Sequence, residues 1–273
     1  MTSDEKKTTI NGKRYQYYDI GSGNIAGLFL HGTAGSKETM LGIANKYSSL
    51  FRCIVPDLPG NNGLECNEKL TLKYISEYLG NLLANLKIHE LFIIGFSLGG
   101  LVGLVFCAQP DLPFKVRSLV IWSAPILGYK KGLTAKSKFL FDLLSYTPDR
   151  FGNELKQTPI LTKGSQILGL KLGNTELEAV KNFGGVGPNN YVRILKDFKF
   201  KHLKLIPSLY VFGTQDPLVI NNNYTFIRDN CNNNEKALLI DRGGHFGTKD
   251  GWKKSEEVIA NFVSGTIGAE GGI

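Results

Sequence analysis

Short apolar runs that end at Gly, Pro or Asp recur along the chain and predict buried strands. The runs are apolar on both faces, which is typical of strands in a parallel sheet covered by helices on both sides. They are Gly27 to Leu30, Cys53 to Val55, Leu91 to Ile94, Leu119 to Trp122, Leu209 to Phe212 and Ala237 to Ile240. Helical spacing of apolar residues lies between them, most clearly over residues 72–86 after Thr71, a good N-cap. Strand, helix, strand is the order of a mostly parallel α/β sheet flanked by helices.

The first twenty residues carry a hairpin signal instead. Residues 8–10 and 15–20 read as strands, and they flank Asn11-Gly12. This dipeptide best accepts positive φ at both central positions of a tight turn. We therefore expect the chain to open with a β-hairpin.

The alternation of strands and helices stops between Pro125 and Pro207. That stretch of about 80 residues has no run typical of a strand, but it has helical patterns over residues 138–144 and 190–198. A glycine-rich run at 184–188 is neither preceded by a strand nor followed by Gly-Lys-Ser/Thr, so we interpret it as a turn rather than a phosphate loop. The prediction is one α/β core formed by residues 1–125 and 207–273, with residues 126–206 inserted as a helical cap.

Composition adds that the chain is globular and basic. Of its 273 residues, 42% are hydrophobic and 21% are charged, which suits a folded domain with a sizeable core. The net charge is +8, but the lysines are scattered and form neither an Arg-rich block nor a nucleic-acid motif. We expect a solvated basic face and no nucleic-acid partner.

Cysteine spacing and hydropathy bear on compartment and cofactors. Cys53, Cys66, Cys107 and Cys231 are far apart and form no CxxC pair, so neither a zinc site nor a redox motif is predicted. No apolar stretch follows the charged start, and none elsewhere reaches the length of a membrane span. We expect a cytoplasmic protein with no metal, no organic cofactor and no stable membrane association.

Ser97 stands at the most informative point of the chain. Gly95-Phe96-Ser97-Leu98-Gly99-Gly100 joins the apolar run ending at Ile94 to a helical pattern over residues 101–108. A GxSxG pentapeptide alone is a weak signal, but a serine on a strained strand-to-helix turn is presented outward at a helix N-terminus. This context favours a nucleophile over a serine in an ordinary glycine-rich turn.

A second turn follows the run that ends at Leu30. His31-Gly32-Thr33 lies where a loop that stabilises an oxyanion is needed, and the backbone N–H groups of Thr33 and Leu98 are the predicted oxyanion hole. His31 precedes Ser97 in the chain, so we expect it to hold the loop by hydrogen bonds rather than to act in catalysis.

By these residues the chain resembles the capped α/β-hydrolase superfamily over nearly all of its length except the cap. The landmarks are His31-Gly32, Asp57-Leu58-Pro59-Gly60, the Ser97 turn, Gly213-Thr214-Gln215-Asp216-Pro217 and Gly243-Gly244-His245-Phe246. The resemblance implies, in this order, the oxyanion loop, a structural turn, the nucleophile Ser97, the triad acid Asp216 and the triad base His245.

Other acids and bases compete for these roles. The sixth predicted strand ends in Trp122-Ser123-Ala124-Pro125 without a carboxylate, whereas Asp216 follows the next strand. Asp57 suits a structural turn, and Asp241 ends the last strand. Among the histidines, His89 ends a helix and His202 faces solvent from the linker after the cap, so His245 is the favoured base.

A carboxylic ester of a small molecule is the substrate that needs only this machinery. Lactones, thioesters and carbon–carbon bonds are cleaved by the same triad, and a binding protein on this fold with little turnover is an alternative from another class. A lipase that uses the apolar stretch at 139–144 to meet lipid is a further alternative, although we expect this stretch to pack in the core. The oligomeric state stays open.

Overall fold

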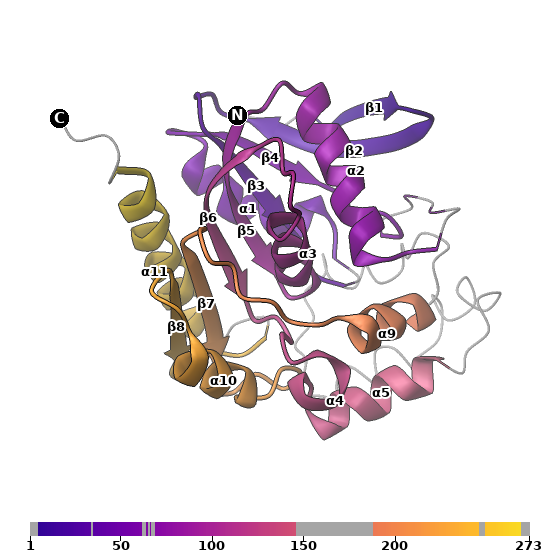
Figure 1. Cartoon of the computed structure of the whole chain (residues 1–273), viewed down its shortest axis with the longest axis vertical. Helices are drawn as coiled ribbons and strands as arrows, with labels where there is room; N and C mark the ends of the chain where they lie inside the picture. The colour runs from indigo at the N-terminus through magenta and orange to yellow at the C-terminus, as the bar shows by residue number, and fades with distance from the viewer. Residues whose placement is uncertain are drawn as a thin grey trace.

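Eight strands form one twisted sheet in the computed structural model (Figure 1). The structure describes residues 5–33, 35–61, 64, 66, 69–145, 188–245 and 249–268. The strands are β1 (Lys6–Ile10), β2 (Lys13–Ile20), β3 (Ala26–Leu30), β4 (Arg52–Pro56), β5 (Glu90–Phe96), β6 (Lys115–Trp122), β7 (Ser208–Gly213) and β8 (Glu235–Ile240). Their order across the sheet is β1-β2-β4-β3-β5-β6-β7-β8. All six buried runs lie within β3 to β8, so the predicted α/β-hydrolase architecture is confirmed.

The expected hairpin opens the chain. β1 pairs antiparallel with β2, and the turn residues Asn11 and Gly12 have φ values of 50° and 75°. Positive φ at both central positions is what the dipeptide predicts. β2 then pairs antiparallel with β4, while every pair from β4 to β8 is parallel.

Helices cover both faces of the sheet. On one face α1 (Lys37–Tyr47) and α11 (Lys249–Gly268) pack on side chains such as Phe29 and Val211. On the other face α2 (Leu72–Asn85), α3 (Leu98–Cys107) and α10 (Asn222–Asn230) pack on side chains such as Leu30 and Tyr210. The apolar runs of β3 to β7 are thus buried on both faces, which explains why they are continuous, whereas β1, β2 and β8 stay partly exposed.

The described part of the segment between β6 and β7 consists of helices joined by turns and loops, and it contains no strand, only an isolated bridge from Leu133 to Val219. It contains α4 (Gly128–Gly132), α5 (Ala135–Ser145) and α9 (Pro188–Asp197). Thr134 Oγ1 donates to the Pro217 carbonyl at 2.8 Å, which ties the start of the segment to the loop after β7. Residues 146–187, including most of the glycine-rich run, lie outside the described residues, so the division into core and cap stays a prediction.

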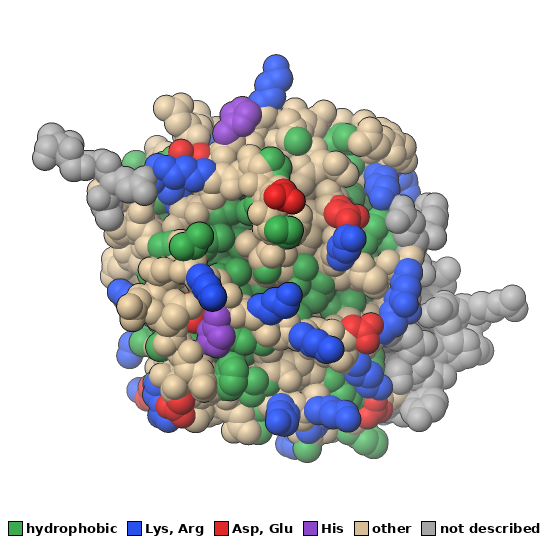
Figure 2. All heavy atoms as spheres, in the orientation of Figure 1, with side chains coloured by type: hydrophobic (Ala, Val, Ile, Leu, Met, Phe, Trp, Pro, Cys, Tyr) green, Lys and Arg blue, Asp and Glu red, His purple; other side chains and the backbone are tan. Residues whose placement is uncertain are grey.

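The apolar stretch of α5 is buried only in part. Phe141 packs against the core cluster, as expected, but Phe139 is 72% exposed. Figure 2 shows Lys and Arg side chains scattered over the face that carries the inserted helices, between patches of hydrophobic atoms. In the described part of the chain, no helix has the length and hydropathy that crossing a membrane requires.

Candidate active site

Ser97 occupies the tight turn between β5 and α3. Its φ of 51° and ψ of −114° lie in a region of backbone conformation that residues other than glycine rarely adopt. A Cβ added to Gly99 would lie 2.3 Å from the Leu30 carbonyl oxygen, so only glycine allows the turn to approach β3 this closely. The strained turn expected at Ser97 is therefore present, and the residue stays partly accessible.

Asp216 and His245 lie together after β7 and β8. His245 Nδ1 is 2.8 Å from Asp216 Oδ2, and the two side chains are only 3% and 2% exposed. Because a carboxylate only accepts, the proton between them is on Nδ1, which leaves Nε2 as the basic nitrogen of the neutral ring. Asp216 Oδ1 accepts the backbone N–H groups of Leu218 and Val219 at 2.8 and 2.9 Å, so the carboxylate is fixed on both oxygens.

Backbone contacts lock the two loops that carry this pair. A Cβ on Gly213 would lie 2.1 Å from the Gly243 carbonyl oxygen, so the loops meet where neither has a side chain. Gln215 N donates to the Gly243 carbonyl at 2.9 Å, and Arg242 N donates to Thr214 Oγ1 at 2.7 Å. The geometry of the Asp216–His245 pair is thereby set before any ligand arrives.

Packing brings these loops to the serine turn. The His245 ring lies 5.1 Å from the ring of Phe96, the residue directly before Ser97. A Cβ built on Gly32 would lie 3.1 Å from the Ser97 Cβ, so the loop after β3 also borders the serine. Loops from the carboxyl ends of β3, β5, β7 and β8 thus converge on one point, as expected for ligand sites of α/β sheets.

His31 holds the loop after β3, as the sequence predicts. Leu58 N–H donates to His31 Nε2 at 3.0 Å, so His31 Nδ1 carries the ring proton and donates to the Gly32 carbonyl at 2.8 Å. The side chain is fully buried, and this burial lowers its pKa below the ordinary value, which keeps the ring neutral. Thr33, at the end of this loop, is half-buried beside it.

Asp57 is bound to a buried lysine that sequence reasoning missed. Lys37 N and Nζ donate to the two oxygens of Asp57, each at 2.8 Å, and both side chains are at most 2% exposed. Lys37 Nζ also pairs with Glu5 and Glu38 at 2.9 and 3.0 Å. Both oxygens of Asp57 are occupied, so it joins α1 to the turn after β4 rather than orienting His245.

The remaining competitors lie elsewhere. α2 ends at Asn85, so His89 stands exposed in the loop before β5 and does not end a helix as predicted. His202 is exposed, as expected, but sequence reasoning missed that its Nδ1 pairs with Glu235 Oε2 at 2.6 Å. Asp241 follows the last residue of β8 and pairs with its neighbour Arg242 on the surface.

Sequence comparisons agree with this architecture. A family model described as alpha/beta hydrolase fold matches residues 28–251. An uncharacterized protein of Mycobacterium tuberculosis is 30% identical over 197 residues, which cover 69% of this chain and 52% of the relative, so the chain spans about half that relative's length. A pimeloyl-(acyl-carrier protein) methyl ester esterase of Wigglesworthia glossinidia brevipalpis is 26% identical over 210 residues, covering 73% of this chain and 78% of the esterase.

Solved structures match over almost the whole chain. The N-acyl homoserine lactonase AidH, complexed with N-butanoyl homoserine, superposes with a TM-score of 0.75 at 16% identity, covering 96% of this chain and 97% of the lactonase. An esterase from Exiguobacterium antarcticum superposes with a TM-score of 0.72 at 15% identity, covering 96% and 100%. At such identities the likeness shows a shared fold alone.

Proposed function

The chain belongs to the alpha/beta hydrolase fold family, and from that membership we propose that it is a serine hydrolase acting on carboxylic esters. Ser97 is the proposed nucleophile, His245 the base and Asp216 the acid. The observation that carries the proposal is the buried Asp216–His245 pair packed against Phe96, next to the strained turn of Ser97.

In the proposed reaction His245 Nε2 takes the Ser97 proton while Ser97 Oγ attacks the ester carbonyl carbon. The backbone N–H groups of Thr33 and Leu98 are the proposed donors to the tetrahedral oxyanion, and Leu98 is the first residue of α3, whose N-terminal dipole favours that charge. His245 then protonates the departing alcohol. Water, activated by the same imidazole, releases the acid from the acyl-enzyme.

Asp216 has a positioning part in this proposal. Its Oδ2 fixes the His245 tautomer with the proton on Nδ1, and its negative charge stabilises the imidazolium that forms during attack. The two backbone donors on Oδ1 keep the carboxylate oriented through the cycle. No metal or organic cofactor takes part in the proposed steps.

A small-molecule ester is the proposed substrate class. One curated relative is named as a methyl ester esterase, and the matching structures include an esterase and a lactonase. Residues 126–206 are the proposed cap over the site, and their side chains would set the acyl preference. Lactones share the carbonyl chemistry with esters and belong in the same assay.

The test is hydrolysis of p-nitrophenyl esters of rising acyl length, together with aryl lactones and thioesters, by the wild-type chain and by Ser97→Ala. We expect the wild type to hydrolyse esters and Ser97→Ala to have a kcat lower by a factor of at least about 10³. Ser208→Ala, at the other end of the sheet, is the matched control and should retain the wild-type rate. Equal rates for wild type and Ser97→Ala, with unchanged circular dichroism, would refute the proposal.

A further inference from the structure

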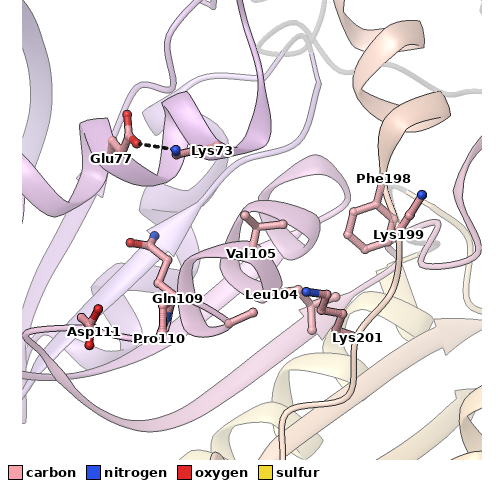
Figure 3. Close-up of a pocket in the computed structure, with 11 residues that line it drawn as sticks. Lys73, Glu77, Leu104, Val105, Gln109, Pro110, Asp111, Phe198, Lys199 and Lys201 are labelled. Atoms are coloured by element: carbon pink, nitrogen blue, oxygen red, sulfur yellow. Dashed lines mark ion pairs between the residues drawn. The ribbon is translucent and has the colours of Figure 1, made fainter.

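A cleft opens at the C-terminal end of α3, the end remote from Ser97, and Figure 3 shows the residues that line it. Its volume is about 480 Å³, within the size range of small-molecule sites. α3 has ten residues, a length of about 15 Å at 1.5 Å per residue. Residues 108–111, beyond its last turn, line the cleft. The cleft is therefore separate from the candidate active site.

The floor of the cleft is apolar. Leu104, Val105 and Ala108 contribute from α3 and its C-cap, while Pro110 and Phe198 close it from the two sides. Leu104 is buried, and Val105 and Phe198 are half-buried. Apart from Leu104, these side chains leave apolar surface open to water, and an alkyl chain laid along them would remove that surface from solvent.

The charges at the rim are unevenly distributed. Lys199 and Lys201 extend from the segment after α9, on the side of Phe198, whereas Glu77 and Asp111 stand on the opposite side (Figure 3). Lys73 is already paired with Glu77 at 3.7 Å. Within the described part of the chain, neither Lys199 nor Lys201 forms an ion pair. The wall beside Phe198 thus carries two ammonium groups, whereas the opposite wall carries two carboxylates and one ammonium group and is negative on balance.

We propose that this cleft binds an alkyl monocarboxylate. The carboxylate lies at Lys199 and Lys201, and the alkyl chain lies over Leu104 and Val105 toward Pro110. Glu77 and Asp111 stand where the far end of the chain arrives, so a second carboxylate there meets like charge. The cleft therefore selects monocarboxylates over dicarboxylates of the same length, a selection that does not depend on any reaction at Ser97.

The experiment titrates the full chain calorimetrically with octanoate and with octanedioate, at equal ionic strength and below the micelle concentration. Octanoate should bind saturably, with octanedioate at least about fivefold weaker because of the repulsion at the acidic wall. The double variant Lys199→Glu/Lys201→Glu should raise the Kd of octanoate by at least about fivefold. Lys204 is an exposed lysine of the same segment that does not line the cleft. Lys204→Glu is therefore the control, and it should change the Kd of octanoate by less than about twofold.

A steric variant tests the location without changing charge. Ala108 is exposed and lines the cleft, so Ala108→Trp fills the cleft while leaving the core intact, which circular dichroism checks. Octanoate binding should then be lost. Binding that survives both Ala108→Trp and the double lysine variant, octanedioate that binds as well as octanoate, or no octanoate binding at all would each overturn the proposal.

A further arm separates the cleft from the candidate active site. Octanoate binding should survive modification of Ser97 by a fluorophosphonate. Loss of binding on modification, with the cleft variants unaffected, would place the ligand at Ser97 and overturn the proposal. If Ser97 does not react, the proposed hydrolase function is in question, but the cleft variants still decide the present proposal.

Discussion

Two histidine–carboxylate pairs lie at opposite ends of the same two strands. Asp216 and His245 follow the carboxyl ends of β7 and β8, with 2.8 Å between Nδ1 and Oδ2. His202 precedes β7, and its Nδ1 lies 2.6 Å from Oε2 of Glu235, the first residue of β8. The distance between ring and carboxylate therefore does not distinguish the two pairs.

Their surroundings distinguish them. Asp216 Oδ1, the oxygen not bonded to His245, accepts two backbone N–H groups, and its partner His245 is buried against the residue that precedes Ser97. Glu235 accepts a backbone N–H too, from Asn232 at 3.2 Å, but it also accepts the side-chain hydroxyl of Tyr210 at 3.0 Å and so joins three segments near the amino ends of the strands. A histidine–carboxylate pair is a candidate for catalysis when it adjoins a nucleophile turn, and otherwise it stabilises the fold.

The largest expected difference between the pairs is catalytic. Asp216→Asn should lower kcat by on the order of 10³ to 10⁴, because the amide stabilises neither the Nδ1–H tautomer nor the imidazolium. Glu235→Gln, the matched change in the other pair, should leave kcat within about twofold. Steady-state kinetics on a p-nitrophenyl ester measures both. Comparable losses in the two variants would remove the distinction drawn between the pairs.

The next largest effect concerns Asp57, which also follows a strand but is held by Lys37. Lys37→Met leaves the buried Asp57 carboxylate without its cation, so the free energy of unfolding should fall by about 3–5 kcal/mol. Lys46→Met, which removes the exposed pair of the same helix with Glu256, should cost less than about 1 kcal/mol. Urea denaturation compares them. Equal losses in the free energy of unfolding would show that the buried Lys37–Asp57 pair stabilises the fold no more than the exposed pair does.

A smaller loss of stability is expected at the second histidine pair. Glu235→Ala removes the acceptor of the buried Tyr210 hydroxyl and the partner of His202, which should lower the free energy of unfolding by about 1–3 kcal/mol. Glu77→Ala, at an exposed carboxylate, should stay within about 0.5 kcal/mol. Denaturant midpoints report the difference, and a Glu235→Ala variant as stable as Glu77→Ala would argue against the stabilising role.

The smallest effect is on pH dependence. Burial lowers the pKa of His31 below its ordinary value of 6.5. Just below pH 6.5, His31 is therefore protonated in the unfolded chain and still neutral in the folded chain. This contribution to stability is present above pH 6.5 and is lost as the pH falls below it. The unfolding free energy of His31→Gln should therefore fall less between about pH 7.5 and 5.5 than that of the wild type. Parallel curves would contradict a depressed pKa.

Local sequence signals predicted much of the fold. The Asn11-Gly12 turn and the apolar runs depend on neighbours in the chain, and both were enough to locate their elements. β6 and β8 begin earlier than predicted, at Lys115 and Glu235, because polar residues start these strands before the apolar run. The Ser97 turn could be predicted equally well, because its strand, its glycines and its helix are contiguous in the sequence.

Contacts between distant segments were not predictable in this way. Lys37 and Asp57 are 20 residues apart, and His202 and Glu235 are 33 apart, with no spacing pattern that links either pair. Lysine is almost never fully buried unless it is paired, so a single sequence predicts that Lys37 faces solvent. The burial of Lys37, Asp57 and Glu235 is decided by tertiary packing, which the periodicity of one chain does not encode.

The most direct test of the central claim is the site of covalent modification by a fluorophosphonate. Intact mass should show one adduct per wild-type chain, and peptide mapping should locate it on Ser97. Ser97→Ala should give no adduct, and Asp216→Asn should give the same adduct much more slowly, with Glu235→Gln reacting at the wild-type rate. Stoichiometric labelling of Ser97→Ala, or an adduct on another residue of the wild type, would contradict the assignment of Ser97 as the nucleophile.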